Sequence, residues 1–233
     1  PSVGRGEEYR FFSEDLSVGV AHPSGPLTAC KGAGGSESLC LSGAASEQTT
    51  FVRKDFTPDG GICQAGCFRP LVTGCPVLGL PCAREVQEAA DVPEGTMFGE
   101  TGDCPGPSIP KPYCGPEFLG ASADASHIII GACANGGVCA PVPSLTATSA
   151  PGGGLYEWSA GVPAGEQLAL VSMLPGDEGA DAASTPQLGN GSRIVRNAVA
   201  DSGLRVVWEA REHLYMRYNA TRVQSPLGVA GEC

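Results

Sequence analysis

Lysine and aromatic residues are scarce in this chain. Only 6% of its 233 residues are aromatic, three are lysine (Lys31, Lys54 and Lys111), and the formal net charge is −11. A protein that binds nucleic acid needs clustered cations to replace the counterions of the phosphate backbone. This composition therefore predicts that the chain does not bind nucleic acid. No apolar run reaches the roughly 18 residues that a transmembrane helix needs, so we expect no membrane-spanning segment.

Recognisable catalytic patterns are also lacking. The nucleophile-elbow pattern Gly-x-Ser-x-Gly is absent from the sequence. Ser122, Asp124 and His127 form a Ser/Asp/His set, but such sets occur by chance in most chains, and His127 begins an expected strand. We therefore expect these three residues to be structural. The sequence predicts no catalytic residue and no bound cofactor.

Glycine and proline are abundant, at 34 and 20 residues, which favours many short strands and tight turns. One phrase occurs three times: an apolar stretch, a turn containing Asp, and a second apolar stretch. Its copies are residues 11–20, 118–130 and 195–208. Asp and Ser side chains hydrogen-bond backbone groups two residues on and so close turns locally. Since the flanking residues are mostly β-branched or aromatic, each copy predicts a β-hairpin.

A second hairpin signal follows each copy of the phrase. Its two expected strands are residues 50–55 and 67–72 after the first copy, 154–159 and 167–174 after the second, and 213–218 and 221–223 after the third. Two hairpins in each repeat make a four-stranded antiparallel unit, which is the size of one β-propeller blade.

At this point the chain resembles a known family, the bacterial propellers of the TolB-like or WD40-like repeat type. The resemblance lies in Ser-x-Asp-x-Ser, at Ser13–Ser17 and Ser122–Ser126, and in Leu-Tyr-x-Trp or Leu-Tyr-x-Arg, at Leu155–Trp158 and Leu214–Arg217. The third copy departs from the first pattern, because Ala200 stands at the first Ser position. The resemblance implies a propeller, and a generic all-β sandwich is the alternative.

The expected fold is all-β: one domain, residues 1–233, built as a β-propeller-like array of about three four-stranded antiparallel blades stapled by disulfides. The expected parts are blade 1 at about 8–75, a Cys/Pro-rich insertion at about 76–117, blade 2 at about 118–175 and blade 3 at about 193–225. The insertion is either a binding loop or a cover for an exposed edge strand. Three blades are fewer than the usual four to eight. The chain is therefore expected to be part of a longer propeller or of an assembly, for example two copies supplying six blades.

Eleven cysteines place the chain in an oxidising compartment. Their spacing suggests sequential local pairs, namely Cys30 with Cys40, Cys63 with Cys67, Cys75 with Cys82, Cys104 with Cys114, and Cys133 with Cys139. Cys233 is left over, as an intermolecular bridge or a free thiol. A metal site is the alternative, but the sequence has no Cys-x-x-Cys pair and only three histidines.

Two weaker patterns concern calcium and glycans. The acidic stretch 177–181 offers carboxylates that suit a calcium ion, although a solvated loop is the commoner outcome. Asn190 and Asn219 begin Asn-x-Ser/Thr sequons at expected turns, which makes them candidate N-glycosylation sites in a secreted protein.

Taken together, these patterns predict a non-enzymatic protein, extracellular or on the cell surface, that binds or scaffolds protein or cell-surface partners through its blade loops. The first alternative is a structural subunit of an extracellular filament or surface layer, in which unpaired blade edges and Cys233 mediate self-association. The second alternative is a hydrolase built on a propeller.

Overall fold

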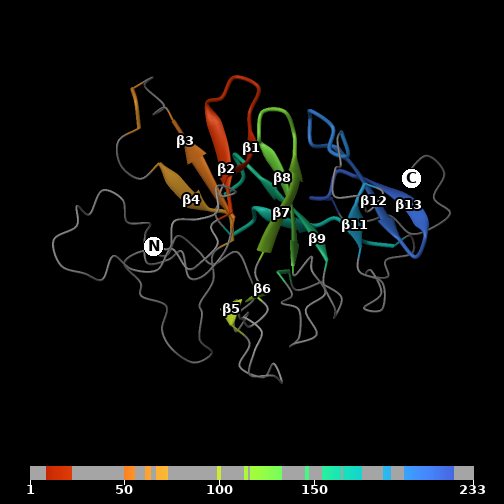
Figure 1. Ribbon diagram of the computed structural model, residues 1–233. Helices are drawn as coiled ribbons and strands as arrows, with labels where there is room; N and C mark the ends of the chain where they lie inside the picture. The colour runs from red at the N-terminus through yellow and green to blue at the C-terminus, as the bar shows by residue number, and fades with distance from the viewer. Residues whose placement is uncertain are drawn as a thin grey trace.

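The computed structural model (Figure 1) describes residues 9–22, 50–55, 61–63, 67–72, 99–100, 113–114, 116–132, 145–146, 154–163, 165–174, 186–189 and 197–222. Within these residues the regular elements are β-strands, and all the strand pairs are antiparallel. None of these residues forms a helix with the length and apolar character needed to cross a membrane. The expected all-β class is confirmed for the described part of the chain.

Two sheets are four-stranded meanders in which sequence neighbours pair. Sheet 1 consists of β1 (Tyr9–Phe12), β2 (Val18–Ala21), β3 (Phe51–Lys54) and β4 (Phe68–Pro70). Sheet 2 consists of β7 (Pro116–Ala121), β8 (His127–Ala132), β9 (Leu155–Ser159) and β10 (Leu168–Leu170). The hairpins predicted for the first two repeats are thus formed as expected.

Sheet 3 has three strands in the described residues, β11 (Gln187–Leu188), β12 (Arg205–Ala210) and β13 (His213–Tyr218), in that order. β11 pairs with β12 although it precedes the predicted third repeat. Near the start of β12, next to the turn at residues 200–205, the neighbouring segment is joined to β12 by a single bridge between Val199 and Val206. The expected last strand, 221–223, is not seen: the Arg222 amide donates to the Asn219 carbonyl at 2.9 Å in a turn, and Val223 lies outside the described residues.

A small two-stranded sheet, β5 (Gly99–Glu100) with β6 (Tyr113–Cys114), lies within the Cys/Pro-rich segment, where no strand was expected. Figure 1 shows it apart from the three larger sheets. It does not decide between the two roles expected for this segment.

The three larger sheets stack side by side, with sheet 2 in the middle (Figure 1). One core lies between sheets 1 and 2 and includes Val20 and Val52 from sheet 1 and Ile128, Ile130 and Trp158 from sheet 2. These side chains point to a common interface because residues two apart on a strand share a face.

A second core lies between sheets 2 and 3. It includes Ile129 and Leu155 from sheet 2, and Leu188, Val206 and Trp208 from sheet 3. Sheet 2 is therefore apolar on both faces. This explains its run of three consecutive isoleucines, because a strand covered on both sides loses the usual alternation of apolar and polar residues.

The first strands of the repeats lie next to one another. The rings of Phe11 in β1 and Phe118 in β7 are 6.0 Å apart. On the other side of β7, a Cβ atom added to Gly120 would lie 2.7 Å from Leu188 Cδ2 and 3.9 Å from Val199 Cγ2. A side chain at this position would require Leu188 to move, so glycine favours the close approach of sheet 3 to β7.

The two-sided core predicts a large penalty for truncation in sheet 2. Ile128 is fully buried, and Ile128→Ala should lower the free energy of unfolding by about 2–5 kcal/mol, because it leaves a cavity between sheets 1 and 2. Urea denaturation measures this. The matched control is Ile62→Ala, at a side chain that is 75% exposed, which should change the free energy of unfolding by less than about 0.5 kcal/mol. Equal effects of the two substitutions would contradict this packing.

Candidate binding surface at the hairpin turns

The Ser-x-Asp-x-Ser phrase forms the same hydrogen-bonded turn in sheets 1 and 2. In sheet 1, the Ser13 hydroxyl donates to Asp15 Oδ1 at 2.7 Å and accepts from the Val18 amide at 2.9 Å. Asp15 Oδ1 also accepts from the Ser17 amide, at 3.0 Å. The predicted link from an Asp side chain to a backbone group two residues on is confirmed.

The turn in sheet 2 repeats this network with the same partners. The Ser122 hydroxyl donates to Asp124 Oδ1 at 2.7 Å and accepts from the His127 amide at 3.0 Å, while the Ser126 amide donates to Asp124 Oδ1 at 3.0 Å. Ser13 and Ser122 are almost wholly buried. Each hydroxyl therefore takes the place of a backbone acceptor for a strand amide that would otherwise be left unpaired.

A residue with positive φ follows the Asp position in each turn. Leu16 has φ 59° and Ala125 has φ 56°, and their amides donate to the carbonyls of Ser13 and Ser122 at 2.9 Å. Four-residue hairpin loops are commonly built in this way, around a type I turn. The left-handed conformation costs a non-glycine residue about 1 kcal/mol or more, which the side-chain network of the turn offsets.

The third turn keeps this backbone pattern but changes its residues. Gly203 has φ 67° and donates its amide to the Ala200 carbonyl at 2.7 Å, so Gly203 aligns with Leu16 and Ala125. The residue at the Asp position is then Ser202, whose hydroxyl accepts from the Leu204 amide at 3.4 Å. The alignment of Ala200 with the first Ser of the phrase is therefore confirmed, and Asp201 takes the position of Glu14 and Ala123.

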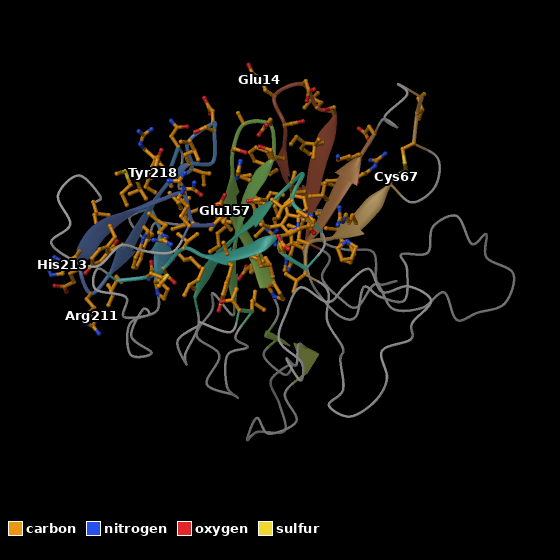
Figure 2. All side chains as sticks on the ribbon, turned by 180° about the vertical axis from the view of Figure 1, so that it is seen from behind. Glu14, Cys67, Glu157, Arg211, His213 and Tyr218 are labelled. Atoms are coloured by element: carbon orange, nitrogen blue, oxygen red, sulfur yellow. A yellow bond between two sulfur atoms is a disulfide. The ribbon has the colours of Figure 1, made fainter. Side chains whose placement is uncertain are left out.

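The turns lie together at one end of the stack. The Glu14 amide donates to the Ala123 carbonyl at 3.2 Å, which joins the first turn to the second. The third turn packs on sheet 2, because a Cβ atom at Gly203 would overlap the His127 ring. Figure 2 shows Glu14 at the tip of the first turn. We call the exposed residues of these turns the turn surface, namely Glu14, Asp15, Leu16, Ala123, Asp124, Asp201, Ser202 and Leu204.

Two carboxylates of the turn surface, those of Asp15 and Asp124, have pKa values below the ordinary value for Asp. The hydroxyl of Ser13, then the amide and hydroxyl of Ser17, lower the pKa of Asp15 to about 2. Partial burial acts to raise the pKa of Asp124, but hydrogen bonds from the Ser126 amide and the Ser122 and Ser126 hydroxyls outweigh it, so this pKa also lies below its ordinary value. The turn surface is thus anionic, and two of its carboxylates are held in fixed positions.

A second polar cluster lies behind the turns, on the face of sheet 2 toward sheet 3. His127 Nδ1 is 2.6 Å from Glu157 Oε1, and the Ser159 hydroxyl donates to the same carboxylate oxygen at 3.2 Å. Glu157 and Ser159 are buried, with 3% of each exposed. His127 pairs with Ser159 across β8 and β9, so the sheet register alone brings the cluster together.

This cluster does not have the arrangement of a nucleophilic triad. A triad places the hydroxyl on one ring nitrogen and the carboxylate on the other. Here both Ser159, at 3.4 Å, and Glu157 approach Nδ1. In the set considered from the sequence, Ser122 bonds to the Asp124 side chain but contacts His127 only at its backbone. The His127 ring bonds to Glu157 instead.

Glu157 was missed from the sequence because it lies inside the apolar motif Leu155–Trp158. The signal that could have found it was a charged residue at the centre of an otherwise apolar strand. Such a carboxylate needs a buried partner, and the hairpin register offers His127.

Most of the predicted disulfides cannot be compared with the structure. Cys63 and Cys67 form a disulfide, with Cα atoms 5.7 Å apart. The backbone of Cys114 belongs to β6. The other cysteines lie outside the described residues: Cys30, Cys40, Cys75, Cys82, Cys104, Cys133, Cys139 and Cys233.

Of the remaining predicted sites, Asn190 and the acidic stretch 177–181 lie outside the described residues. Asn219 lies in the turn that follows β13, with φ 49°, and the Thr221 hydroxyl donates to its Oδ1 at 2.6 Å. The described residues contain no group of three or more His, Cys, Asp or Glu side chains placed to hold a metal ion. Glycosylation of Asn219 stays a prediction.

Comparison with protein-family models, curated proteins and solved structures finds no match to this chain. The resemblance to TolB-like or WD40-like propellers therefore stays a prediction that rests on the repeated motifs.

The turn carboxylates predict a pH dependence of stability. Their pKa values are lower in the folded chain than the ordinary value near 4, so the unfolded chain binds more protons. Their contribution to stability is complete above about pH 4 and is lost as the pH falls toward the folded pKa of Asp15, about 2. The effect is small, because both groups are solvent-exposed and screened. The double variant Asp15→Asn/Asp124→Asn should show a flatter fall of melting temperature with pH in this window. A slope equal to that of the wild type would contradict the assignment.

The buried turn hydroxyl predicts a larger cost than its exposed neighbour. Ser122→Ala should lower the free energy of unfolding by about 1–3 kcal/mol, because it removes a fully buried hydroxyl and leaves the His127 amide without its acceptor. Ser126→Ala, which removes hydroxyl contacts to Asp124 at the exposed rim, should cost less than about 1 kcal/mol. Urea denaturation compares the two variants, and the reverse order of their effects would overturn the role given to Ser122.

Proposed function

We propose that this chain is a non-enzymatic, extracellular binding or scaffold protein of the β-propeller type, and that it presents the turn surface to a protein or cell-surface partner. The observation that carries this proposal is the repeated stacking of antiparallel sheets, with the turns of their first hairpins joined at one end. The hydrogen bond from Glu14 to Ala123 and the packing of Gly203 on His127 link the three turns.

The propeller type is supported by the order of the strands. Propeller blades are antiparallel sheets of four sequential strands placed around an axis, and sheets 1 and 2 have this order. β7 lies between β1 on one side and Leu188 and Val199 on the other, as the first strands of neighbouring blades would. Three sheets are fewer than a closed propeller needs, so the proposal requires further sheets from another chain or from a longer protein.

The extracellular location is supported by the Cys63–Cys67 disulfide within a chain of eleven cysteines. Structural disulfides persist in oxidising compartments. Strands this short in a chain this rich in glycine and proline gain stability from covalent closure of their connecting segments.

Binding through the turns is supported by their fixed geometry and their charge. Ser13, Asp15 and Ser17 hold the first turn in one conformation before any partner arrives, which lowers the entropy lost on binding. The carboxylates of Glu14, Asp15, Asp124 and Asp201 lie on this surface and favour a partner with a basic face.

A structural subunit of an extracellular filament or surface layer is the second candidate. The observation that favours it is the exposed apolar row of Leu214, Met216 and Tyr218 on sheet 3. A propeller-based hydrolase is less well supported, because the His127 cluster places its hydroxyl and its carboxylate at a single ring nitrogen.

The binding proposal predicts contacts confined to the turn surface. A photo-cross-linking amino acid placed at Leu16, which is 65% exposed, should trap a discrete partner on the producing cells. The matched control position is Glu212, an exposed turn residue between β12 and β13 with φ 62°, close to the φ of 59° at Leu16. We expect one cross-linked species from Leu16 and none from Glu212, as read by gel mobility and mass spectrometry. Equal adducts from both positions, or none from either, would reject the proposal.

A further inference from the structure

The outer face of sheet 3, which points away from sheet 2, carries a row of exposed apolar side chains. Leu214 is 66% exposed, Met216 51% and Tyr218 46%, and their spacing of two places them on the same face of β13. On β12, Val207 pairs with Met216 on this face, and the Arg205 guanidinium lies 5.5 Å from the centre of the Tyr218 ring. Figure 2 shows Tyr218 on this end sheet.

The repeat identifies what this face corresponds to in sheet 2. Leu214–Arg217 matches Leu155–Trp158 in the Leu-Tyr motif, so Leu214 takes the position of Leu155. The strand registers agree: Ile129 pairs with Glu157 in sheet 2 just as Val207 pairs with Met216 in sheet 3. Leu155 and Ile129 are buried against sheet 3. Leu214 therefore occupies a position that, in the preceding repeat, is covered by the next sheet.

The opposite end of the stack carries the other half of this contact. In the turn-based alignment, Phe12 corresponds to Ala121 and Val199, since these residues pair with Gly19, Ile128 and Val206 respectively. Ala121 packs toward sheet 1 and Val199 packs toward sheet 2, so this position faces the preceding sheet in both repeats.

On sheet 1 there is no preceding sheet among the described residues, and Phe12 is 49% exposed. Its ring stacks on Tyr9, with centroids 5.1 Å apart, beside Gly19. The outer face of sheet 3 is thus the one that a following sheet would cover, and the outer face of sheet 1 is the one that a preceding sheet would cover.

We infer that the outer face of sheet 3 binds the outer face of sheet 1 of a second copy of this chain, head to tail. The inference rests on the propeller-type arrangement proposed above and names the partner of its open ends. Contacts between neighbouring sheets within the chain are heterologous, and a heterologous contact between copies repeats the same step. If two copies close on each other, the assembly has six sheets, within the four to eight of propellers. If they do not close, the same contact extends into a filament.

The test uses two variants, each with a carboxylate that blocks one of the two contact faces. Phe12→Asp blocks the sheet 1 face, and Met216→Asp blocks the sheet 3 face. Light scattering should give a mass above the 23.6 kDa of one chain for the wild type, rising with protein concentration until assembly is complete. Each variant alone should stay at the mass of one chain, because a buried carboxylate weakens the contact by at least about tenfold. An equal mixture of the two should restore a species of two chains, since each supplies the face that the other lacks.

Other outcomes identify what fails. Ile62→Asp, at an exposed site between β3 and β4 that belongs to neither face, should assemble like the wild type, and circular dichroism checks that all variants fold. A wild type that remains one chain at every concentration would overturn the inference. So would a Phe12→Asp variant that still pairs by itself, because that result means two sheet 3 faces bind each other. Neither outcome affects cross-linking at Leu16, so failure of this contact and failure of the binding proposal remain distinguishable.

Discussion

Every other feature of this structure depends on one constraint: a repeat of this kind has apolar side chains on both faces of its sheet. Ile129 points one way from β8 while Ile128 and Ile130 point the other way, and all three are fully buried. A single sheet cannot bury both of its faces by itself, so each repeat is stable only between neighbours. Stability is then shared across the stack, as in other repeat proteins. The two end sheets inherit the same problem, which is why Phe12 and Leu214 remain exposed.

The turns solve a different problem, the register of each hairpin. If the strand pairing slipped by one residue, Ile128 and Ile129 would each turn to the face that the other now occupies. The buried Glu157 would then lie away from His127. Ser13 and Ser122 prevent a slip because each hydroxyl accepts from one particular strand amide, that of Val18 or His127. The third repeat has Ala200 at this position. Its β12 is held instead by the Val199 bridge and by β11, two short contacts in place of one continuous strand.

The sequence was a good guide where structure is local and a poor one where it depends on distant parts of the chain. The hairpins at Asp15 and Asp124 could be predicted, because the residues that close each turn lie within five positions of one another. The contribution of β11 could not, because Gln187 pairs with Glu209 across a gap in sequence that no turn motif marks. The third turn contains Asp201, but Asp201 does not hold the position of Asp15 and Asp124. In the folded chain the marker of the turn is the residue with positive φ, and Gly203 adopts that conformation with no Asp at the preceding position.

The candidate surface was predictable in outline for the same reason, but its chemistry was not. Asp15 and Asp124 appear in the sequence as exposed acidic groups, yet the same Oδ1 atom of each accepts several hydrogen bonds from its own turn. An oxygen used in this way contributes its charge to a partner through space, and it would have to break the turn to bind a metal ion directly. The proposed recognition at this end of the stack would therefore depend on long-range charge and fixed shape. The carboxylates that hold the hairpins closed also set the sign of the surface they expose.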